Sequence, residues 1–218
     1  MVMNFFRGAS DGLEQVESEV AVMLASCRHS FDLAMSTLVT DADIAPLGDE
    51  IRSTDSKINA IEENVRRELL VHSAVQGGSD VGAVLSLLLV VKKLERVGDQ
   101  AKNILNLAEA GVRFSGADDY DRFVAYRSRV SALFADAQTL LGQTDPDIAA
   151  FVDGGTSLMD ECEAVVISFL HDEGPGSYAV PRAMLFRYLK RTVANILGTI
   201  VTTVDGVDRT GDDDDLDE

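Results

Sequence analysis

The chain has little proline and lacks the alternation of apolar and polar residues that marks a β-strand. It contains four prolines in 218 residues. Its apolar residues recur every three or four positions over long stretches, which is the period of an amphipathic helix. The missing strand signal excludes β and mixed α/β architectures, so we predict an all-α protein.

Long apolar runs are also missing. The longest extends from Val81 to Val91 and is interrupted by Gly82 and Ser86, whereas a helix that crosses a bilayer needs about 20 apolar residues. The residues from Met1 to Arg7 do not form a basic segment followed by an apolar stretch and a small-residue cleavage site. We therefore expect a cytoplasmic protein that does not insert into the membrane.

Cysteine and histidine are scarce, which limits the metal chemistry available to the chain. Cys27 and Cys162 each lie in an apolar helical pattern, which predicts buried thiols and not a disulfide or a zinc site. Ferritin-like oxidases need Glu-x-x-His pairs. None of the three histidines follows a Glu at that spacing, since Glu68 precedes His72 by four residues.

Basic residues are outnumbered, with 19 Lys and Arg against 37 Asp and Glu and a net charge of −18. This balance argues against nucleic acids and anionic membranes as partners, because both require clustered positive charge. The dense acids at the C-terminus predict a disordered tail over 210–218. No basic anion pocket, P-loop or nucleophile elbow is visible in the sequence, so we do not expect an enzyme.

The apolar pattern predicts six long helices. The first starts at Asp11 and ends near Leu38, the second runs from Ile44 to Gly77-Gly78, and Ser79 or Asp80 caps the third, which ends before Gly111. The others are expected over about 117–142, 145–171, with Pro146 in its first turn, and 180–208. We predict two tandem antiparallel three-helix bundles, over 8–112 and 117–209, packed as one unit.

Four carboxylates border the apolar stripes of the second and third predicted helices. Counted from the Gly77-Gly78 turn at about 1.5 Å per residue, Asp55 and Asp99 lie level to within about 1.5 Å, and Glu62 and Glu95 to within about 3 Å. Two acids four residues apart on one helix repel each other. A cluster of this kind forces protonation or recruits a cation, and oxygen donors suit hard or carboxylate-bridged metal ions.

The same spacing also fits ordinary ion pairs. Glu62 and Glu63 each precede an arginine by four residues, and Lys92 and Lys102 lie three residues from Glu95 and Asp99. Spacing alone leaves both readings open, a metal site and a salt-bridged surface.

The segment from Ser53 to Glu109 resembles the PhoU family of phosphate-uptake regulators. The family pattern E/D-x-x-x-D, in a Leu-Glu-Arg-Ile-Gly-Asp context, is matched by Leu94-Glu95-Arg96-Val97-Gly98-Asp99, where only Val97 differs. The resemblance implies a cytoplasmic six-helix protein that binds iron or other divalent metal ions through Asp55, Glu62, Glu95 and Asp99. It also implies a regulatory role at a phosphate transporter and its sensor histidine kinase.

The second repeat departs from this pattern. Lys190 and Ala194 stand where the family has acids, so the second metal site is expected to be missing. We hypothesise that Lys190 or Arg191 supplies positive charge there by pairing with Asp160 or Glu163.

Three functions remain open from the sequence. The favoured one is a metal-loaded regulator of phosphate transport and phosphate-starvation signalling that docks on a transporter subunit or a kinase and forms a homodimer. The metal would be iron by the resemblance, with Zn, Mn or Mg as other candidates. The alternatives are a structural helical adaptor without metal and a carboxylate-bridged metal enzyme.

Overall fold

The computed structural model describes residues 13–76, 80–143, 145–171 and 173–206, and all of its regular structure is helical. The first three helices are α1 (Glu14–Val39), α2 (Ile44–Gln76) and α3 (Val81–Glu109). The other three are α4 (Tyr120–Leu141), α5 (Ala149–Leu170) and α6 (Gly176–Asp205). The predicted all-α class and six-helix order are confirmed.

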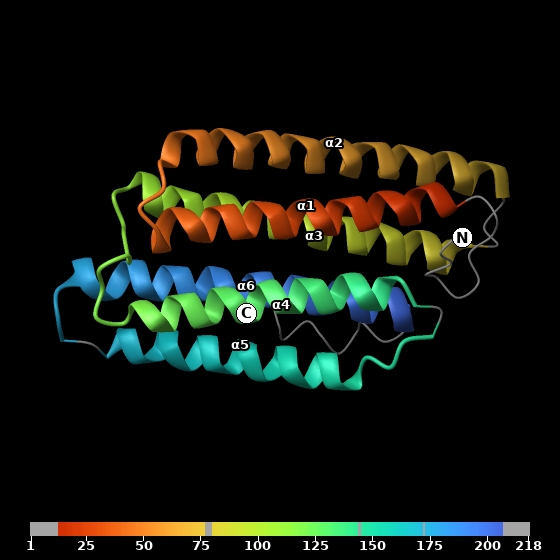
Figure 1. The fold of residues 1–218 in the computed structure, drawn as a ribbon. Helices are drawn as coiled ribbons and strands as arrows, with labels where there is room; N and C mark the ends of the chain where they lie inside the picture. Colours follow the sequence, from red (N-terminus) through yellow and green to blue (C-terminus); the bar gives the residue numbers. More distant parts are fainter. Residues whose placement is uncertain (1–12, 77–79, 144, 172, 207–218) are drawn as a thin grey trace.

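The helices form two antiparallel three-helix bundles that share a centre (Figure 1). Helices α1, α3, α4 and α6 pack in the middle, with α2 on one outer side and α5 on the other. Contacts of α1 with α4 and of α3 with α6 join the two bundles. No helix in the described part of the chain is both long enough and apolar enough to cross a membrane.

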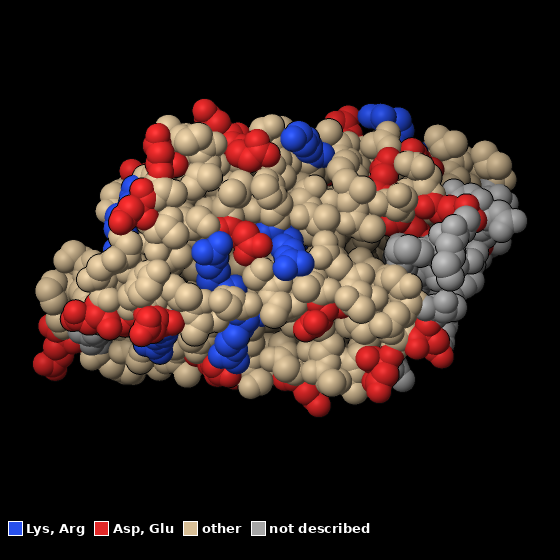
Figure 2. Space-filling model, viewed as in Figure 1, with Lys and Arg blue, Asp and Glu red and all other residues tan. Residues whose placement is uncertain are grey.

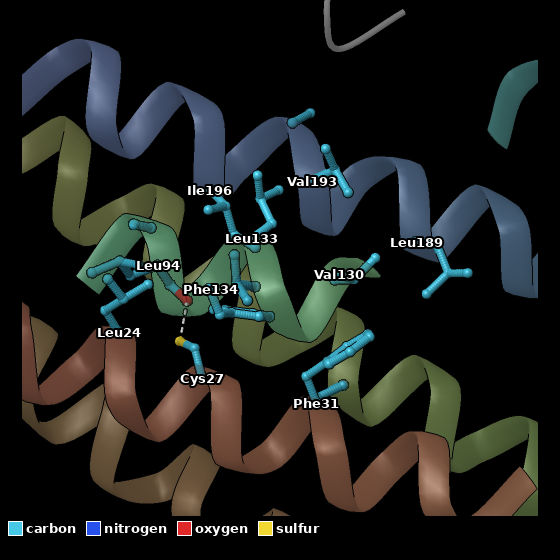
Figure 3. Packing of buried hydrophobic residues seen from close by; sticks show 14 of the residues in the cluster. Leu24, Cys27, Phe31, Leu94, Val130, Leu133, Phe134, Leu189, Val193 and Ile196 are labelled. Atoms are coloured by element: carbon cyan, nitrogen blue, oxygen red, sulfur yellow. Dashed lines mark hydrogen bonds between the residues drawn. The ribbon is translucent and has the colours of Figure 1, made fainter. Parts of the chain in front are cut away.

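A single core of buried apolar side chains runs through both bundles. Figure 3 shows its middle, where Phe31 of α1 tilts against Phe134 of α4 with ring centroids 5.6 Å apart. The apolar stripe of α1 is buried along its whole length. Its residues are Leu13, Val16, Val20, Leu24, Cys27, Phe31, Ala34 and Leu38.

Both cysteines are free and buried in this core, as the sequence predicts. The Cys27 thiol donates a hydrogen bond to the carbonyl oxygen of Leu94 at 3.2 Å (Figure 3). Burial is the main cause that raises the pKa of Cys27 well above its usual value and the pKa of Cys162 to about 12. Both thiols therefore stay protonated at neutral pH and are poor nucleophiles.

The connection between the bundles is anchored by aromatic rings and one buried ion pair. Phe114 stacks on Phe123 with centroids 4.0 Å apart. Arg182 of α6 donates two hydrogen bonds to the Asp119 carboxylate, at 2.9 and 2.8 Å, and its guanidinium lies 3.7 Å from the ring centroid of Tyr178. These contacts fix the start of α4 against the start of α6.

Charged side chains also hold the seam between α1 and α4. In Figure 2, basic side chains gather around an acid in the middle of this face, while most other acids lie near the edges. Arg28 donates to the side chain of Gln138 at 3.2 Å, and Arg127 donates to the carbonyl oxygen of Asp32 at 3.4 Å. The Asp32 carboxylate accepts a bond from Ser131 at 3.2 Å.

Helix α3 starts where the sequence predicts but lacks the predicted capping bond, and the starts of α5 and α6 differ from the expectation. Asp80 occupies the N-cap position of α3, but its carboxylate makes no capping bond and lies 3.0 Å from His72 Nε2. Helix α5 begins at Ala149 and not near Pro146, because the Asp147 side chain accepts the Ala149 N–H at 3.0 Å.

Helix α6 begins four residues before Val180. The Pro175 carbonyl accepts bonds from the N–H groups of Tyr178 and Ala179, which starts the helix at Gly176. Pro181 then lies inside the helix near its start. The predicted start at Asp11, the Gly77-Gly78 turn and the acidic tail lie outside the described residues.

Candidate functional site

The four predicted acids, Asp55, Glu62, Glu95 and Asp99, lie on the facing flanks of α2 and α3, and we call them the hairpin acids. The structure brings them together in two pairs at the heights that the sequence predicts. Asp55 lies across from Asp99, and Glu62 lies across from Glu95. Each pair shares the ammonium group of one lysine of α3.

Lys102 joins the first pair. Its Nζ lies 3.0 Å from Asp55 Oδ2 and 2.8 Å from Asp99 Oδ1. Burial by itself would lower the pKa of Lys102, but its hydrogen bonds to Asp99 and Asp55 outweigh this effect and the pKa is raised. The ammonium therefore stays charged and bridges the two helices.

Lys92 joins the second pair less tightly. Its Nζ lies 2.7 Å from Glu95 Oε2 and 3.8 Å from Glu62 Oε1. Arg66 lies 2.7 Å from the same Glu62 oxygen. The ion pairs that the alternative reading expects are therefore present, and two of the lysine contacts also cross from α3 to α2.

The side chains of the hairpin acids are buried to different extents. The side chains of Asp55, Glu62 and Glu95 are 13%, 11% and 16% exposed, whereas Asp99 is 44% exposed. Asp55 Oδ1 is buried and accepts no hydrogen bond. Buried oxygens of Glu62 and Glu95 contact cations at 2.7 Å but lack hydrogen-bond geometry.

Gly98 brings the two helices close together at this point. A Cβ atom added there would lie 3.3 Å from Ile58 Cδ1 and 3.6 Å from Asp55 Oδ1. A methyl group at this position would require the end of the Ile58 side chain to shift by a few tenths of an ångström. The missing side chain of Gly98 thus permits the close approach of α2 and α3.

The donor chemistry of this site fits a hard cation, because the buried carboxylate oxygens are left without full hydrogen bonding. However, the described residues contain no group of three or more His, Cys, Asp or Glu side chains placed to hold a metal ion. A metal ion could therefore enter this site only by displacing the two ammonium groups from these oxygens.

The second repeat carries an ion pair at the equivalent place. Lys190 Nζ lies 3.1 Å from Glu163 Oε2. The hypothesis that a basic residue of α6 pairs with an acid of α5 is confirmed for Lys190 and Glu163.

A pocket beside the hairpin acids was not expected from the sequence. It lies between α2, α3 and α6, has a volume of about 620 Å³, and is lined by four basic side chains with Asp99 as the acid among its lining residues. The basic residues are Arg52, Lys102, Arg187 and Arg191. These residues come from three helices, so no local sequence motif contains them. Only the spacing of Arg187 and Arg191 by four residues indicates a common helix face.

Comparison with known proteins agrees with these observations. Residues 20–108, which span nearly all of α1 to α3 and include the hairpin acids, match the family model described as the PhoU domain. The first three helices of this chain are thus similar to the PhoU domain. The resemblance to the PhoU family that the sequence predicts is therefore confirmed.

A curated relative of this chain is the phosphate-specific transport system accessory protein PhoU homolog of Pseudomonas aeruginosa. The two are 27% identical over 146 residues, which is 64% of this chain and 58% of the relative. The matched segment thus spans little more than half of the relative's length.

The crystal structure of PhoU from Pseudomonas aeruginosa has the same fold. It superposes with a TM-score of 0.67 at 22% sequence identity and covers 89% of this chain and 97% of that one. The likeness extends beyond the PhoU domain match, so the second repeat keeps the fold although its acidic pattern is lost.

Proposed function

We propose that this chain is a PhoU-like regulator of phosphate transport and phosphate-starvation signalling, which works in the cytoplasm without a catalytic step. The observation that carries the proposal is that the PhoU domain match covers the three helices that bring the hairpin acids together. The name of the curated relative and the fold of the solved PhoU structure support it.

Deleting the gene in its own organism tests this role. Loss of the regulator should leave phosphate uptake and a phosphate-starvation reporter active when phosphate is abundant. Uptake of labelled phosphate and alkaline phosphatase activity measure the two effects, and the wild-type gene should reverse both. An unchanged response in the deletion strain would contradict the proposal.

A docking surface for a transporter subunit or sensor kinase is proposed at the end of the α2–α3 hairpin. Apolar side chains are strongly exposed there, with Leu70 at 73% and Val75 at 76%. Exposed apolar patches of this kind mark interaction sites. The group also includes Val71, Val81, Leu85 and Leu89.

Substitution of Leu70 and Val75 by Ser tests this surface. The double variant should lose binding to the purified transporter ATPase subunit or kinase domain and keep its helical content. Unchanged binding would place the contact elsewhere. Light scattering of the wild-type chain shows whether the same surface instead joins two copies in a homodimer.

The proposal includes a cation site. We assign Asp55, Glu62, Glu95 and Asp99 as its ligands, because their buried oxygens lack full hydrogen bonding. By the family resemblance the ion would be iron, and Zn, Mn and Mg also accept carboxylate oxygens. When bound, the ion would neutralise the repulsion between the acids and brace α2 against α3, which requires Lys92 and Lys102 to turn away.

The second candidate is a structural adaptor that binds no metal. It is favoured by one observation, the ion pairs of Lys102 with Asp55 and Asp99, which already place a positive charge between these two acids. In this case Lys92 and Lys102 permanently supply the positive charge that a metal ion would otherwise place between the acids of α2 and α3.

Metal content separates the two candidates. The regulator with a cation site predicts stoichiometric metal in the purified wild-type chain and none in Glu95→Gln/Asp99→Asn, with Glu63→Gln as a control because that acid is 79% exposed. The adaptor predicts no metal in any of them. A chelator should lower the melting temperature only if a metal is bound.

A further inference from the structure

Apolar side chains stay exposed where the α2–α3 hairpin ends. On each of the two helices they recur every four residues, so they share a helix face. Surfaces of this kind mark contact sites, and this one therefore calls for a cover. We call it the hairpin-end patch, and its residues are Leu70, Val71 and Val75 of α2 and Val81, Leu85 and Leu89 of α3.

The N-terminal segment of the chain is tethered beside this patch. The start of α1, the end of α2 and the start of α3 lie at the same end of the molecule (Figure 1). Leu13, the residue before α1, is 1% exposed and fixes the chain in the core at this point. Residues 1–12 are therefore attached next to the hairpin-end patch.

The sequence of residues 1–12, which lie outside the described part of the structure, suits an apolar surface. Five of the first six residues are apolar, and Phe5 and Phe6 follow each other. Phenylalanine buries a large apolar area when it finds a contact. The segment has one base, Arg7, and one acid, Asp11, so the acidic body of the chain does not repel it.

The segment is also long enough to reach the patch. Phe6 lies seven residues before Leu13, and an extended chain of that length spans about 23 Å. Leu70 lies six residues before Gln76, the last residue of α2, which corresponds to about 9 Å along the helix. The two phenylalanine rings therefore come within range of the exposed side chains at this end of the hairpin.

The C-terminal segment is a poorer match for the same surface. Residues 207–218 also leave from this end of the molecule, because a Cβ atom at Gly206 would lie 3.9 Å from Ser86 Oγ of α3. Their sequence is dominated by the acids from Asp212 to Asp215 and the acids that follow Leu216. Burying these charges against apolar side chains would cost free energy, so the N-terminal segment is the better occupant.

We propose that residues 1–12 bind back onto the hairpin-end patch, with Phe5 and Phe6 against its Leu and Val side chains. The cover is reversible, because the free energy gained by burying these apolar groups is of the same order as the entropy lost on fixing the segment. A transporter subunit or kinase that docks on this surface has to displace the segment. This competition rests on the proposed function, whereas the contact within the chain does not.

The chain contains no tryptophan, which allows a test of the contact without any partner. In Phe6→Trp the introduced indole is the only one in the protein, and the position stays aromatic. Contact with the patch should shift its emission to shorter wavelengths and protect it from acrylamide quenching. The reference is the same protein unfolded in urea.

Variants of the patch locate the contact. In the Phe6→Trp chain, Leu70→Ser/Val75→Ser should move the emission towards that of the unfolded protein. Leu170→Ser/Val180→Ser is the matched control and should leave the emission unchanged, because these exposed side chains lie at the opposite end of the molecule, where α5 ends and α6 begins. Circular dichroism establishes that both double variants keep their helical content.

Four results would overturn the contact. The first is an indole that emits and is quenched as in the unfolded chain, and the second is an equal shift in both double variants. A shift to shorter wavelengths that appears only as the protein concentration rises would assign the cover to a second copy. A shift that appears only with vesicles of phosphatidylcholine and phosphatidylglycerol would assign the segment to a membrane.

Competition with a partner is tested in the full chain with Phe5→Ser/Phe6→Ser. If the segment covers the patch in about nine-tenths of the molecules, this variant should bind the purified transporter ATPase subunit or kinase domain about tenfold more tightly, because apparent affinity scales with the uncovered fraction. Asn4→Ser is the control and should bind as the wild type does. Equal affinity of both variants, with a shielded indole in Phe6→Trp, would overturn the competition and place the docking surface elsewhere, whereas an exposed indole overturns the contact itself.

Discussion

Lys190 Nζ of α6 lies 3.1 Å from Glu163 Oε2 of α5, so an ion pair links these helices where the PhoU pattern has its second set of acids. The lysine occupies the position of the first acid of that pattern, and Ala194 occupies the position of the second. The two repeats thus use a lysine bridge in the same way, but only the first keeps acids on both of its facing helices.

Restoring the acids of the second repeat should create a metal site. In Lys190→Glu/Ala194→Asp the carboxylate at position 190 faces Glu163 without a lysine between them, and a second acid lies one turn further along α6, so repulsion should lower the melting temperature in the presence of chelator. Added Mn²⁺ should reverse the loss, and elemental analysis should show a higher metal stoichiometry than in the wild type. Unchanged stoichiometry would count against the idea that the lysine replaced a site.

Removing the Lys102 ammonium should weaken the α2–α3 hairpin. In Lys102→Met the carboxylates of Asp55 and Asp99 face each other without a bridge, and we expect the free energy of unfolding to fall by about 1–3 kcal/mol. Urea denaturation measures this loss, with Lys57→Met on the exposed side of α2 as the control. If the acids bind metal, Lys102→Met should bind it more tightly than the wild type, since the competing cation is gone.

The pair of Arg182 and Asp119 should make stability depend on pH in acid. The hydrogen bonds from Arg182, opposed by burial, lower the pKa of Asp119 below its usual 3.8. Because the folded pKa is the lower one, the pair stabilises the fold fully above pH 3.8, and this contribution disappears as the pH falls through the folded value. Stability falls in acid because Asp119 takes up a proton more readily in the unfolded chain than in the folded one.

Asp119→Asn tests this dependence. At pH 7 its free energy of unfolding should lie on the order of 2 kcal/mol below that of the wild type, less than for a fully buried pair because Asp119 keeps 19% exposure. The difference between the two proteins should shrink as the pH drops below 3.8. A difference that stays constant down to pH 2 would show that the charge of Asp119 is not responsible.

Two adjacent glycines of α5 should respond oppositely to alanine. A Cβ atom at Gly155 would lie 2.4 Å from Leu197 Cδ2, whereas one at Gly154 meets nothing within 4 Å. Gly155→Ala should therefore destabilise the protein by about 1–2 kcal/mol, the net of overpacking and better helix propensity. Gly154→Ala should stabilise it by up to about 1 kcal/mol, and thermal melting of the pair gives both signs.

The helices and the heights of the acids were predictable because both follow from regular geometry. The period of the apolar residues sets the helix faces, and a rise of about 1.5 Å per residue sets the level of Asp55 against Asp99. Both predictions need only the sequence spacing and the position of the turn. The same counting placed Lys190 near the acids of α5.

The starts of α5 and α6 were not predictable in this way. Pro146 and Val180 are plausible first-turn positions, but the side chain of Asp147 and the carbonyl of Pro175 start the helices elsewhere. Alternative helix starts of this kind differ in free energy by only a fraction of the energy of one helical turn. Sequence patterns therefore do not tell which of them forms.

The contacts that the lysines of α3 make with α2 could not be predicted either, and neither could the pocket between α2, α3 and α6. The spacing pairs Lys102 with Asp99 on its own helix, but the contact with Asp55 depends on the separation of α2 and α3 at Gly98. The pocket depends on how α6 packs against α3, which brings Arg191 and Gln100 together although they are far apart in the chain.

The common core of the two bundles limits how the chain can be divided. Helices α1 and α3 bury apolar faces against α4 and α6, so a protease cut between Ala110 and Asp119 would not release two independent halves. Each fragment alone would expose a large apolar face to water, and it would precipitate or reassociate with the other fragment. Nicked protein should consequently migrate as an intact particle on a sizing column until denaturant is added.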